Sequence, residues 1–256
     1  MSIDHAHYDE KLAGVYDQMY PVTADTEQAV ALIADLAPPG GRVLELGVGT
    51  GRIALPLAER GFEVHGIDGS EAMLAKLKEQ DAKGAVSTVL GDFTERSTGL
   101  RFDVITVVMN TFFSAITQEQ QLGCLRNAAD QLAPGGRFIL EAFDPAVYHT
   151  MEKQELSMQP LGENGVLLNT LTVDRSQQIM LGTHTILDGG PPETKRHLLR
   201  YAFPFELDLL AKLSGLRLVE RWEDWTRQPY TFRSTRHVSV YEADTGESAG
   251  STPCTG

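Results

Sequence analysis

The chain has 256 residues, 42% of them hydrophobic and 22% charged, which is ordinary for a soluble globular protein and long enough to bury one sizeable core. The formal net charge of -13 disfavours phosphate-rich partners, so we expect no nucleic-acid partner. The two cysteines lack metal-ligand spacing, and no apolar run reaches about 18 residues, so we expect no metal site, no membrane segment and a cytoplasmic location.

Strand-like and helical patterns alternate in the first part of the chain, after residues 1–39, which we expect to form an N-terminal helical cap. Apolar runs that end in glycine or polar residues predict buried parallel strands, and apolar residues at helical spacing predict the helices between them. The predicted strands are residues 41–49, 62–68, 86–92, 102–110 and 137–144. The predicted helices lie in residues 52–61, in 69–80 with Ser70 as N-cap, and in 118–136, where Pro134 and two glycines end the helix. This alternation predicts an α/β fold with a parallel sheet.

The pattern changes after Asp144. Three strand-like runs separated by short polar turns predict an antiparallel meander, at residues 166–174, 177–188 and 195–203. We expect residues 146–203 to form a small antiparallel β flap above the main sheet, inserted after strand five. Residues 40–145 and 204–243 would form the core, the second part supplying a helix at 204–215 and strands at 216–225 and 236–243; the polar tail 244–256 is expected to be disordered.

The loop after the first predicted strand combines an acid with three glycines. It is the stretch Glu45-Leu46-Gly47-Val48-Gly49-Thr50-Gly51, followed by a helix, and Asp68 ends the second strand. Backbone N–H groups and a helix N-terminus suit a nucleotide-like ligand, and Asp68 is placed to accept hydrogen bonds from a ribose diol. The glycines alone also fit a nicotinamide dinucleotide, because the permissive fingerprint can be counted from Gly49.

Glu45 favours a cationic ligand over a pyrophosphate, since a carboxylate beneath the loop repels phosphate and attracts an ammonium or a sulfonium. The ordered set of Glu45 with its glycines, Asp68, Gly91-Asp92-Phe93 and residues 132–140 ("LAPGGRFIL") resembles class I S-adenosylmethionine-dependent methyltransferases. The resemblance implies a Rossmann-like, doubly wound, seven-stranded sheet with an antiparallel last strand. It also implies S-adenosyl-L-methionine as cofactor and S-adenosyl-L-homocysteine as product.

The resemblance also assigns residues to the cofactor. The segment "VYDQMY" at 15–20 resembles small bacterial natural-product N-methyltransferases that act on amino sugars or peptides, in which a tyrosine closes over the methionine end of the cofactor. Asp92 would reach the adenine amino group and Phe93 would flank the ring. The cofactor-binding residues implied in this way are Tyr16, Tyr20, Glu45, Gly47, Gly49, Gly51, Arg52, Asp68, Gly91, Asp92, Phe93 and Met109.

Residues of the acceptor site are expected beyond the carboxyl ends of strands four and five and on the flap. Asn110 is a catalytic candidate, because its side-chain carbonyl could accept a hydrogen bond from an amine; His149 and Tyr16 are the other two. Of the adjacent Phe112 and Phe113, one is expected in the core and the other in the pocket. The substrate-contacting candidates are Phe112, Phe113, Asp144, Tyr148, His184 and Arg196.

The sequence predicts in-line methyl transfer to a small-molecule or peptide natural product, with an amine nitrogen as the favoured acceptor atom. Three alternatives stay open. One is O-, C- or S-methylation, including sulfur chemistry on a cyclic peptide antibiotic; the second is a nicotinamide-dependent oxidoreductase; the third is a protein that binds the cofactor without transferring methyl. The flap could also pack against a second copy of the chain and give a homodimer.

Overall fold

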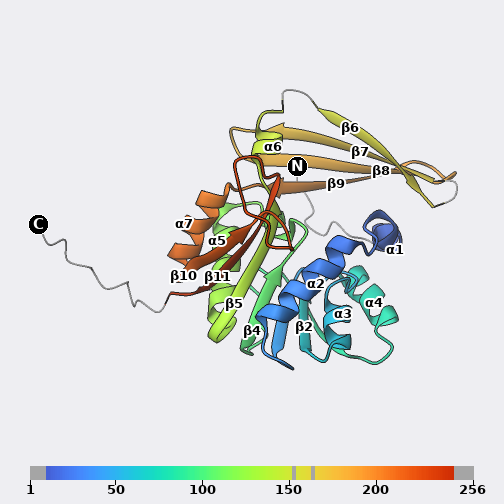
Figure 1. Cartoon of the computed structure of the whole chain (residues 1–256). Helices are drawn as coiled ribbons and strands as arrows, with labels where there is room; N and C mark the ends of the chain where they lie inside the picture. The colour runs from blue at the N-terminus through green and yellow to red at the C-terminus, as the bar shows by residue number, and fades with distance from the viewer. Residues whose placement is uncertain (1–9, 152–153, 163–164, 245–256) are drawn as a thin grey trace, which may run out of the picture.

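The computed structural model describes residues 10–151, 154–162 and 165–244, and these contain a seven-stranded and a four-stranded β-sheet (Figure 1). The larger sheet has the strand order β10-β11-β5-β4-β1-β2-β3. Strands β1 to β5 are parallel to their neighbours among themselves, whereas β11 is antiparallel to both β5 and β10. The predicted Rossmann-like sheet with an antiparallel last strand is therefore confirmed.

The elements of this larger sheet follow the predicted order. Its strands are β1 (Arg42–Leu46), β2 (Glu63–Asp68), β3 (Val86–Leu90), β4 (Phe102–Val107), β5 (Leu132–Phe143), β10 (Leu216–Trp222) and β11 (Arg236–Ala243). The helices are α1 (Glu10–Met19), α2 (Ala24–Leu36), α3 (Ala54–Glu59), α4 (Glu71–Gln80), α5 (Gln118–Gln131) and α7 (Pro204–Leu213), with a 3-10 turn η1 (Thr111–Ser114). None of the helices in the described ranges is long and apolar enough to cross a membrane.

The sheet is buried on both faces by helices, as the near-continuous apolar strands require. Leu44 and Ile105 point into a core on the face that α5 and α7 cover, whereas Val43 and Val104 point into a core shared with α2 and α3 (Figure 1). The strand order reverses between β1 and β4. In open α/β sheets, ligands bind beyond the carboxyl ends of the strands at such a reversal.

Some element ends differ from the prediction. Ser70 caps α4 as expected, its hydroxyl accepting from the Met73 N–H at 3.2 Å. The helix predicted to end at Pro134 and the two glycines already ends at Gln131, and β5 begins at Leu132, which pairs with Phe102. Pro134 also disfavours a helical conformation for the residue before it, so the helix stops short of the proline. The predicted tail lies, from residue 245 on, outside the described residues, as do residues 1–9 of the predicted cap.

The smaller sheet is the flap, which lies across the carboxyl end of the main sheet (Figure 1). It is an antiparallel meander of β6 (Glu155–Leu161), β7 (Gly165–Asp174), β8 (Ile179–Leu187) and β9 (Glu193–Arg200), preceded by the short helix α6 (Ala146–His149). Only three flap strands were predicted, and β6 was missed. It is an edge strand in which Leu156 and Met158 alternate with polar residues, but both are exposed, and Pro160 within the run weakens the strand pattern.

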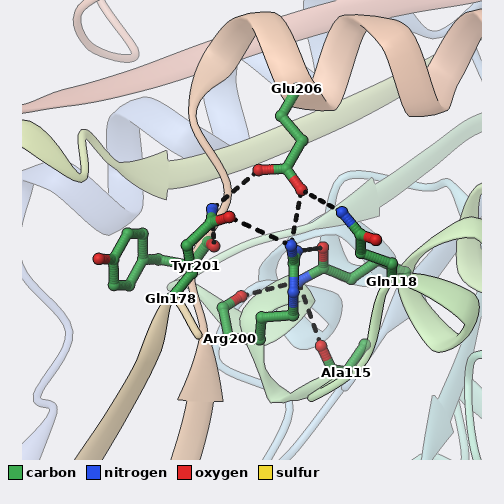
Figure 2. Close-up of polar contacts among 7 residues, drawn as sticks. Ala115, Gln118, Gln178, Arg200, Tyr201 and Glu206 are labelled. Atoms are coloured by element: carbon green, nitrogen blue, oxygen red, sulfur yellow. Dashed lines mark hydrogen bonds and ion pairs between the residues drawn. The ribbon is translucent and has the colours of Figure 1, made fainter. Parts of the chain in front are cut away.

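A buried polar cluster fixes the base of the flap to the main domain (Figure 2). Arg200, at the end of β9, donates to Glu206 on α7 at 2.7 Å and to Gln121 on α5 at 2.7 Å. Gln178 donates to the second oxygen of Glu206 at 2.8 Å, and Gln118 donates to the first at 3.1 Å. The guanidinium is therefore neutralised and hydrogen-bonded where it is buried, which a charge in a protein interior requires.

Candidate functional site

The glycine loop wraps around the end of β2. The Gly49 N–H donates to one carboxylate oxygen of Asp68 at 2.8 Å, and the Ser70 N–H donates to the other at 2.8 Å. Gly47, Gly49 and Gly51 have φ angles of 73°, 54° and 90°, which residues with a side chain rarely adopt. The Gly91 N–H donates to the Asp68 carbonyl at 2.9 Å and so adds the turn after β3 to this group. The structure thus gathers the glycines, Asp68 and Gly91 at the reversal of strand order.

Glu45 lies beneath this loop with a carboxylate oxygen that has no partner. The residue is 3% exposed, and its Oε2 has no hydrogen bond among the described residues. Burial raises the pKa of Glu45 to about 8, although Arg52 and the Ala54 N–H lower it. An unpaired carboxylate in a protein interior is unfavourable unless a ligand brings a donor or a positive charge. The site therefore fits a ligand with a cationic group and does not fit a pyrophosphate.

The N-terminal tyrosines reach the same place. The Tyr16 and Tyr20 ring centroids are 5.0 Å apart. Burial raises the pKa of Tyr16 most; Tyr20, Asp68 and Glu45 raise it further, whereas Arg52 lowers it. The Thr50 hydroxyl donates to Asp17 at 2.6 Å, which ties α1 to the glycine loop. Residues far apart in the sequence thus form one side of the site.

A cavity of about 330 Å³ opens beside this group, within the usual size range of ligand pockets. Of the sequence-predicted residues, Tyr20, Arg52, Met109 and Asn110 line it. The remaining lining residues are Met19, Pro21, Thr23, Asp25, Thr26, Ala29, Ile53, Val108, Glu141 and Trp225.

The ten remaining lining residues were not predicted, and three of them are acidic or aromatic, namely Asp25, Glu141 and Trp225. Strand β10 ends at Trp222, so Trp225 lies beyond the strand; both tryptophans are buried. Glu141 is 7% exposed, and burial raises its pKa. An acid within the apolar run of β5 is the signal that could have identified it. Asp25 is held by two hydrogen bonds from Arg236, at 2.9 and 2.6 Å.

Met109 and Asn110, at the end of β4, have left-handed backbone conformations with φ angles of 54° and 63°. Such strain persists only where surrounding contacts hold it, and it is common at binding sites. The Met109 N–H donates to Glu141 at 2.5 Å, and the Phe143 N–H donates to the Asn110 side-chain oxygen at 2.7 Å. The expectation that this oxygen faces the pocket is therefore corrected, because the β5 backbone holds it.

We expect the Asn110→Ala variant to lower the free energy of unfolding by about 1 to 2 kcal/mol, because it leaves the Phe143 N–H without its acceptor and places alanine in a left-handed conformation. Urea unfolding measures this. Asn110→Asp, which keeps an acceptor and tolerates this conformation, is the control and should stay within about 0.5 kcal/mol of the wild type. An equal loss in both variants would show that the hydrogen bond is not what matters.

Several predicted site residues have other positions. Asp92 is exposed and accepts from the Thr94 N–H at 2.8 Å, whereas Phe93 packs in the core on the α5 side. The expectation that one of Phe112 and Phe113 is in the core and the other in the pocket is wrong, because both are fully buried in that core and neither lines the cavity. Both rings belong to the short 3-10 turn η1, and both point into the core beneath it.

Asp144, Tyr148 and His149 lie around α6 rather than in the cavity. The Asp144 carboxylate caps the Ala146 N–H at 2.9 Å and accepts from the Tyr230 hydroxyl. His149 Nδ1 and the Tyr201 hydroxyl are 2.8 Å apart. Tyr148 packs edge-to-face on Phe143, with 4.9 Å between ring centroids. The Asp144 carboxylate and His149 Nδ1, both candidates for the acceptor site, are therefore engaged in contacts within the protein.

The two flap candidates lie on opposite faces. Met180 and Ile186 on β8 pack in buried clusters, and side chains two residues apart in a strand share a face, so His184 faces inward with them. Arg196 pairs with Thr183 and is exposed on the outer face. The expectation that Arg196 contacts a substrate beneath the flap is therefore wrong; its neighbours on β9, Lys195 and His197, are the inward residues.

A Rossmann-like sheet with this glycine loop, an acid at the end of β2 and an unpaired acid beneath the loop defines the class of S-adenosylmethionine-dependent methyltransferases, and the chain belongs to this family. A methyltransferase domain model matches residues 43–136. The cypemycin N-terminal methyltransferase of a Streptomyces species is 33% identical over 242 residues, which cover 93% of this chain and 98% of that protein.

Solved structures agree. The CcbJ methyltransferase from Streptomyces caelestis has 38% sequence identity and a TM-score of 0.86, over 94% of this chain and 99% of that one. CalS10, an amino pentose methyltransferase from Micromonospora echinaspora, has 19% identity and a TM-score of 0.67, over 93% and 99% of the two chains, and supports the fold alone.

We expect Asp68→Asn to weaken S-adenosylmethionine binding about tenfold, roughly the effect of one lost charge-assisted hydrogen bond. The structure makes asparagine a better test than alanine, because Asp68 also holds the Gly49 and Ser70 N–H groups, and asparagine keeps one acceptor. Calorimetric titration gives the affinity. Unchanged affinity would contradict a ribose contact, and Asp81→Asn, which alters a remote acceptor of the Ala85 and Val86 N–H groups, is the matched control.

Proposed function

We propose that the protein N-methylates an amine of a natural product, either a peptide with a free amino group or an amino sugar. The observation that carries this proposal is the relative described as the cypemycin N-terminal methyltransferase, which this chain matches over 98% of its length. The sugar N-methyltransferase KedS8 from Streptoalloteichus, at 17% identity, supports only the fold.

The chemistry of the site is consistent with an amine. The cofactor supplies an activated methyl group on a sulfonium, so the chain needs mainly to orient the acceptor and exclude water. Glu45 and Arg52 would hold the charged methionine end, Asp68 the ribose, and the turn at Gly91 and Asp92 the adenine. Tyr16 and Tyr20, which lie over the glycine loop, would close the site after binding.

The test is a methylation assay with chemically matched acceptors. The protein is incubated with S-adenosylmethionine and a short peptide with a free amino terminus, the same peptide with an acetylated terminus, or an amino sugar, and mass spectrometry detects the added methyl group. Methylation of a free amine but not of the acetylated peptide supports the proposal. Methylation at oxygen, carbon or sulfur only, cofactor binding without turnover, or binding of nicotinamide dinucleotides instead would each overturn it.

A further inference from the structure

The inner face of the flap carries polar side chains between two apolar contacts. At one end, Met180 packs in the core beneath α5 and α7; at the other, Ile186 packs with Met19 and Tyr20 of the α1 region. At about 3.3 Å per residue, the stretch of β8 between these contacts spans roughly 20 Å. His184 lies within it, with Asn169 opposite on β7. The flap is thus fixed at both ends, and its polar middle bridges the space between them.

His184 is held in one tautomer. Its Nδ1 lies 2.6 Å from Asn169 Oδ1, and because an amide oxygen only accepts, Nδ1 carries the hydrogen and Nε2 holds a lone pair. Nε2 has no hydrogen-bond partner in the part of the chain that the structure describes. Burial lowers the pKa of His184, which keeps the ring neutral near pH 7. The arrangement presents a basic nitrogen on the inner face.

His197 supports this ring from β9. The two imidazoles stack with centroids 4.7 Å apart and an interplanar angle of 16°. Gly182 pairs with His197, and a Cβ atom at Gly182 would lie 2.3 Å from His197 Cε1 and Nε2. Only glycine leaves room for the His197 ring over the β8 backbone. The position of His184 is therefore fixed by a hydrogen bond on one side and by a stacked ring on the other.

This polar strip, Asn169, His184 and His197, adjoins the cavity. Tyr20 packs with the apolar end that contains Ile186 and also lines the cavity beside Arg52 and Asn110. At the other side of the flap, η1, which follows Asn110 directly, packs against β9. The inner face of the flap and the cavity therefore share Tyr20 as a border.

We propose that His184 binds the acceptor amine and takes its proton, an inference that rests on the proposed N-methylation. An alkylamine or amino terminus is largely an ammonium at neutral pH and cannot attack until it loses a proton. One N–H bond of the ammonium breaks, the proton forms a bond with His184 Nε2, and the electron pair stays on the amine nitrogen, ready for the methyl group. The imidazolium then releases the proton to water.

The substrate class that this base requires is an amine that is protonated at working pH, rather than an aromatic amine or an amide. The other titratable groups on the inner face are Glu193, Lys195 and His197 on β9 and Glu155 on β6, with Tyr20 at the apolar end; Lys195 Nζ lies 3.9 Å from the Glu193 carboxylate. Thr185, the neighbour of His184, points to the outer face and pairs with Thr194 at 2.9 Å. It offers a matched control position.

The experiment compares kcat/KM of the wild type, His184→Gln and Thr185→Val on a peptide with a free α-amino group, at pH 7 and pH 9. The α-amino pKa is about 7.7–8.0, so about a tenth of the peptide is neutral at pH 7 and nearly all of it at pH 9. We expect the kcat/KM of His184→Gln to fall about tenfold at pH 7 and little at pH 9. The kcat/KM of Thr185→Val should match that of the wild type at both pH values.

A second variant keeps the ring in place. Asn169→Asp puts a carboxylate against Nδ1, which makes Nε2 the stronger base, so its kcat/KM should equal or exceed that of the wild type at pH 7. A loss in His184→Gln that is equal at both pH values, no loss in His184→Gln, or a loss in Asn169→Asp at pH 7 as large as that in His184→Gln would overturn the role of His184. A wild type that methylates no amine probe would overturn the proposed function and this inference with it, whereas an active wild type with an equally active His184→Gln variant overturns this inference alone.

Discussion

Arg200→Ala is expected to lower the free energy of unfolding by about 3 kcal/mol or more, the typical effect of removing one partner of a buried ion pair. The Arg200 side chain is 7% exposed and Glu206 17%, so water replaces the lost contact poorly. The substitution also leaves Gln121 Oε1 without its donor at 2.7 Å. Because the cluster joins β9 to α5 and α7, we expect the flap to loosen before the main sheet unfolds.

Urea unfolding gives the stability, and hydrogen exchange of the β8 and β9 amides shows where the loss falls. Lys76→Ala is the control, since its ion pair with Glu79 is exposed on one helix face and should contribute about 0.5 kcal/mol or less. A comparable loss in both variants, or protection of the flap unchanged in Arg200→Ala, would contradict the anchoring role.

The same cluster has a defined pH dependence. Burial raises the pKa of Glu206, but hydrogen bonds from Gln178, Arg200 and Gln118 outweigh this and hold it below the usual range. An acid with a lowered pKa contributes stability above its unfolded pKa, about 4.3, and loses that contribution as the pH falls through its folded value. The stability difference between wild type and Arg200→Ala should therefore shrink in acid.

The core of the fold could be predicted because its signals are local. The parallel strands are apolar runs that end in glycine or acid, and α4 begins at a serine that does cap it. The edge strand β6 has no continuous apolar run, because its side chains are mostly exposed and its outer edge pairs with no further strand, which tolerates Pro160. The end of α5 was predicted at Pro134 and lies slightly earlier, at Gln131, because a proline also disfavours a helical conformation for the residue before it.

The site was harder to predict than the fold. Glu45 and Asp68 could be placed from spacing because each lies within the last two residues of a strand whose end the sequence defines. Asn110 was placed correctly in the cavity lining, but the direction of its side chain depends on a left-handed backbone and on a β5 N–H that no local pattern reveals. Glu141 has a local signal, as an acid within the apolar run of β5, whereas His197 is identified only by the register of the flap strands.

S-adenosylmethionine is expected to bind more tightly to the wild type as the pH rises from 6.5 to 8.5, relative to Glu45→Gln. Burial raises the pKa of Glu45 to about 8, so most of the unliganded protein holds a proton there at pH 7. A cationic ligand favours the carboxylate, and binding must release that proton. The same linkage makes the unliganded fold less stable as the pH rises from about 4.3, the usual value for an unfolded glutamate, to about 8.

The ligand's own amino group also titrates in this range, which is why the comparison is with Glu45→Gln, where only the ligand titrates. We expect the ratio of wild-type to variant affinity to rise about 25-fold between pH 6.5 and 8.5, since with a pKa of about 8 the ionised fraction of Glu45 in the unliganded protein rises from about 3% to about 76% over this range. Calorimetry at pH 7 in two buffers of different ionisation enthalpy should show protons released by the wild type in excess of the variant. A ratio that stays constant with pH, together with equal proton release, would mean that Glu45 does not face the cationic end of the ligand.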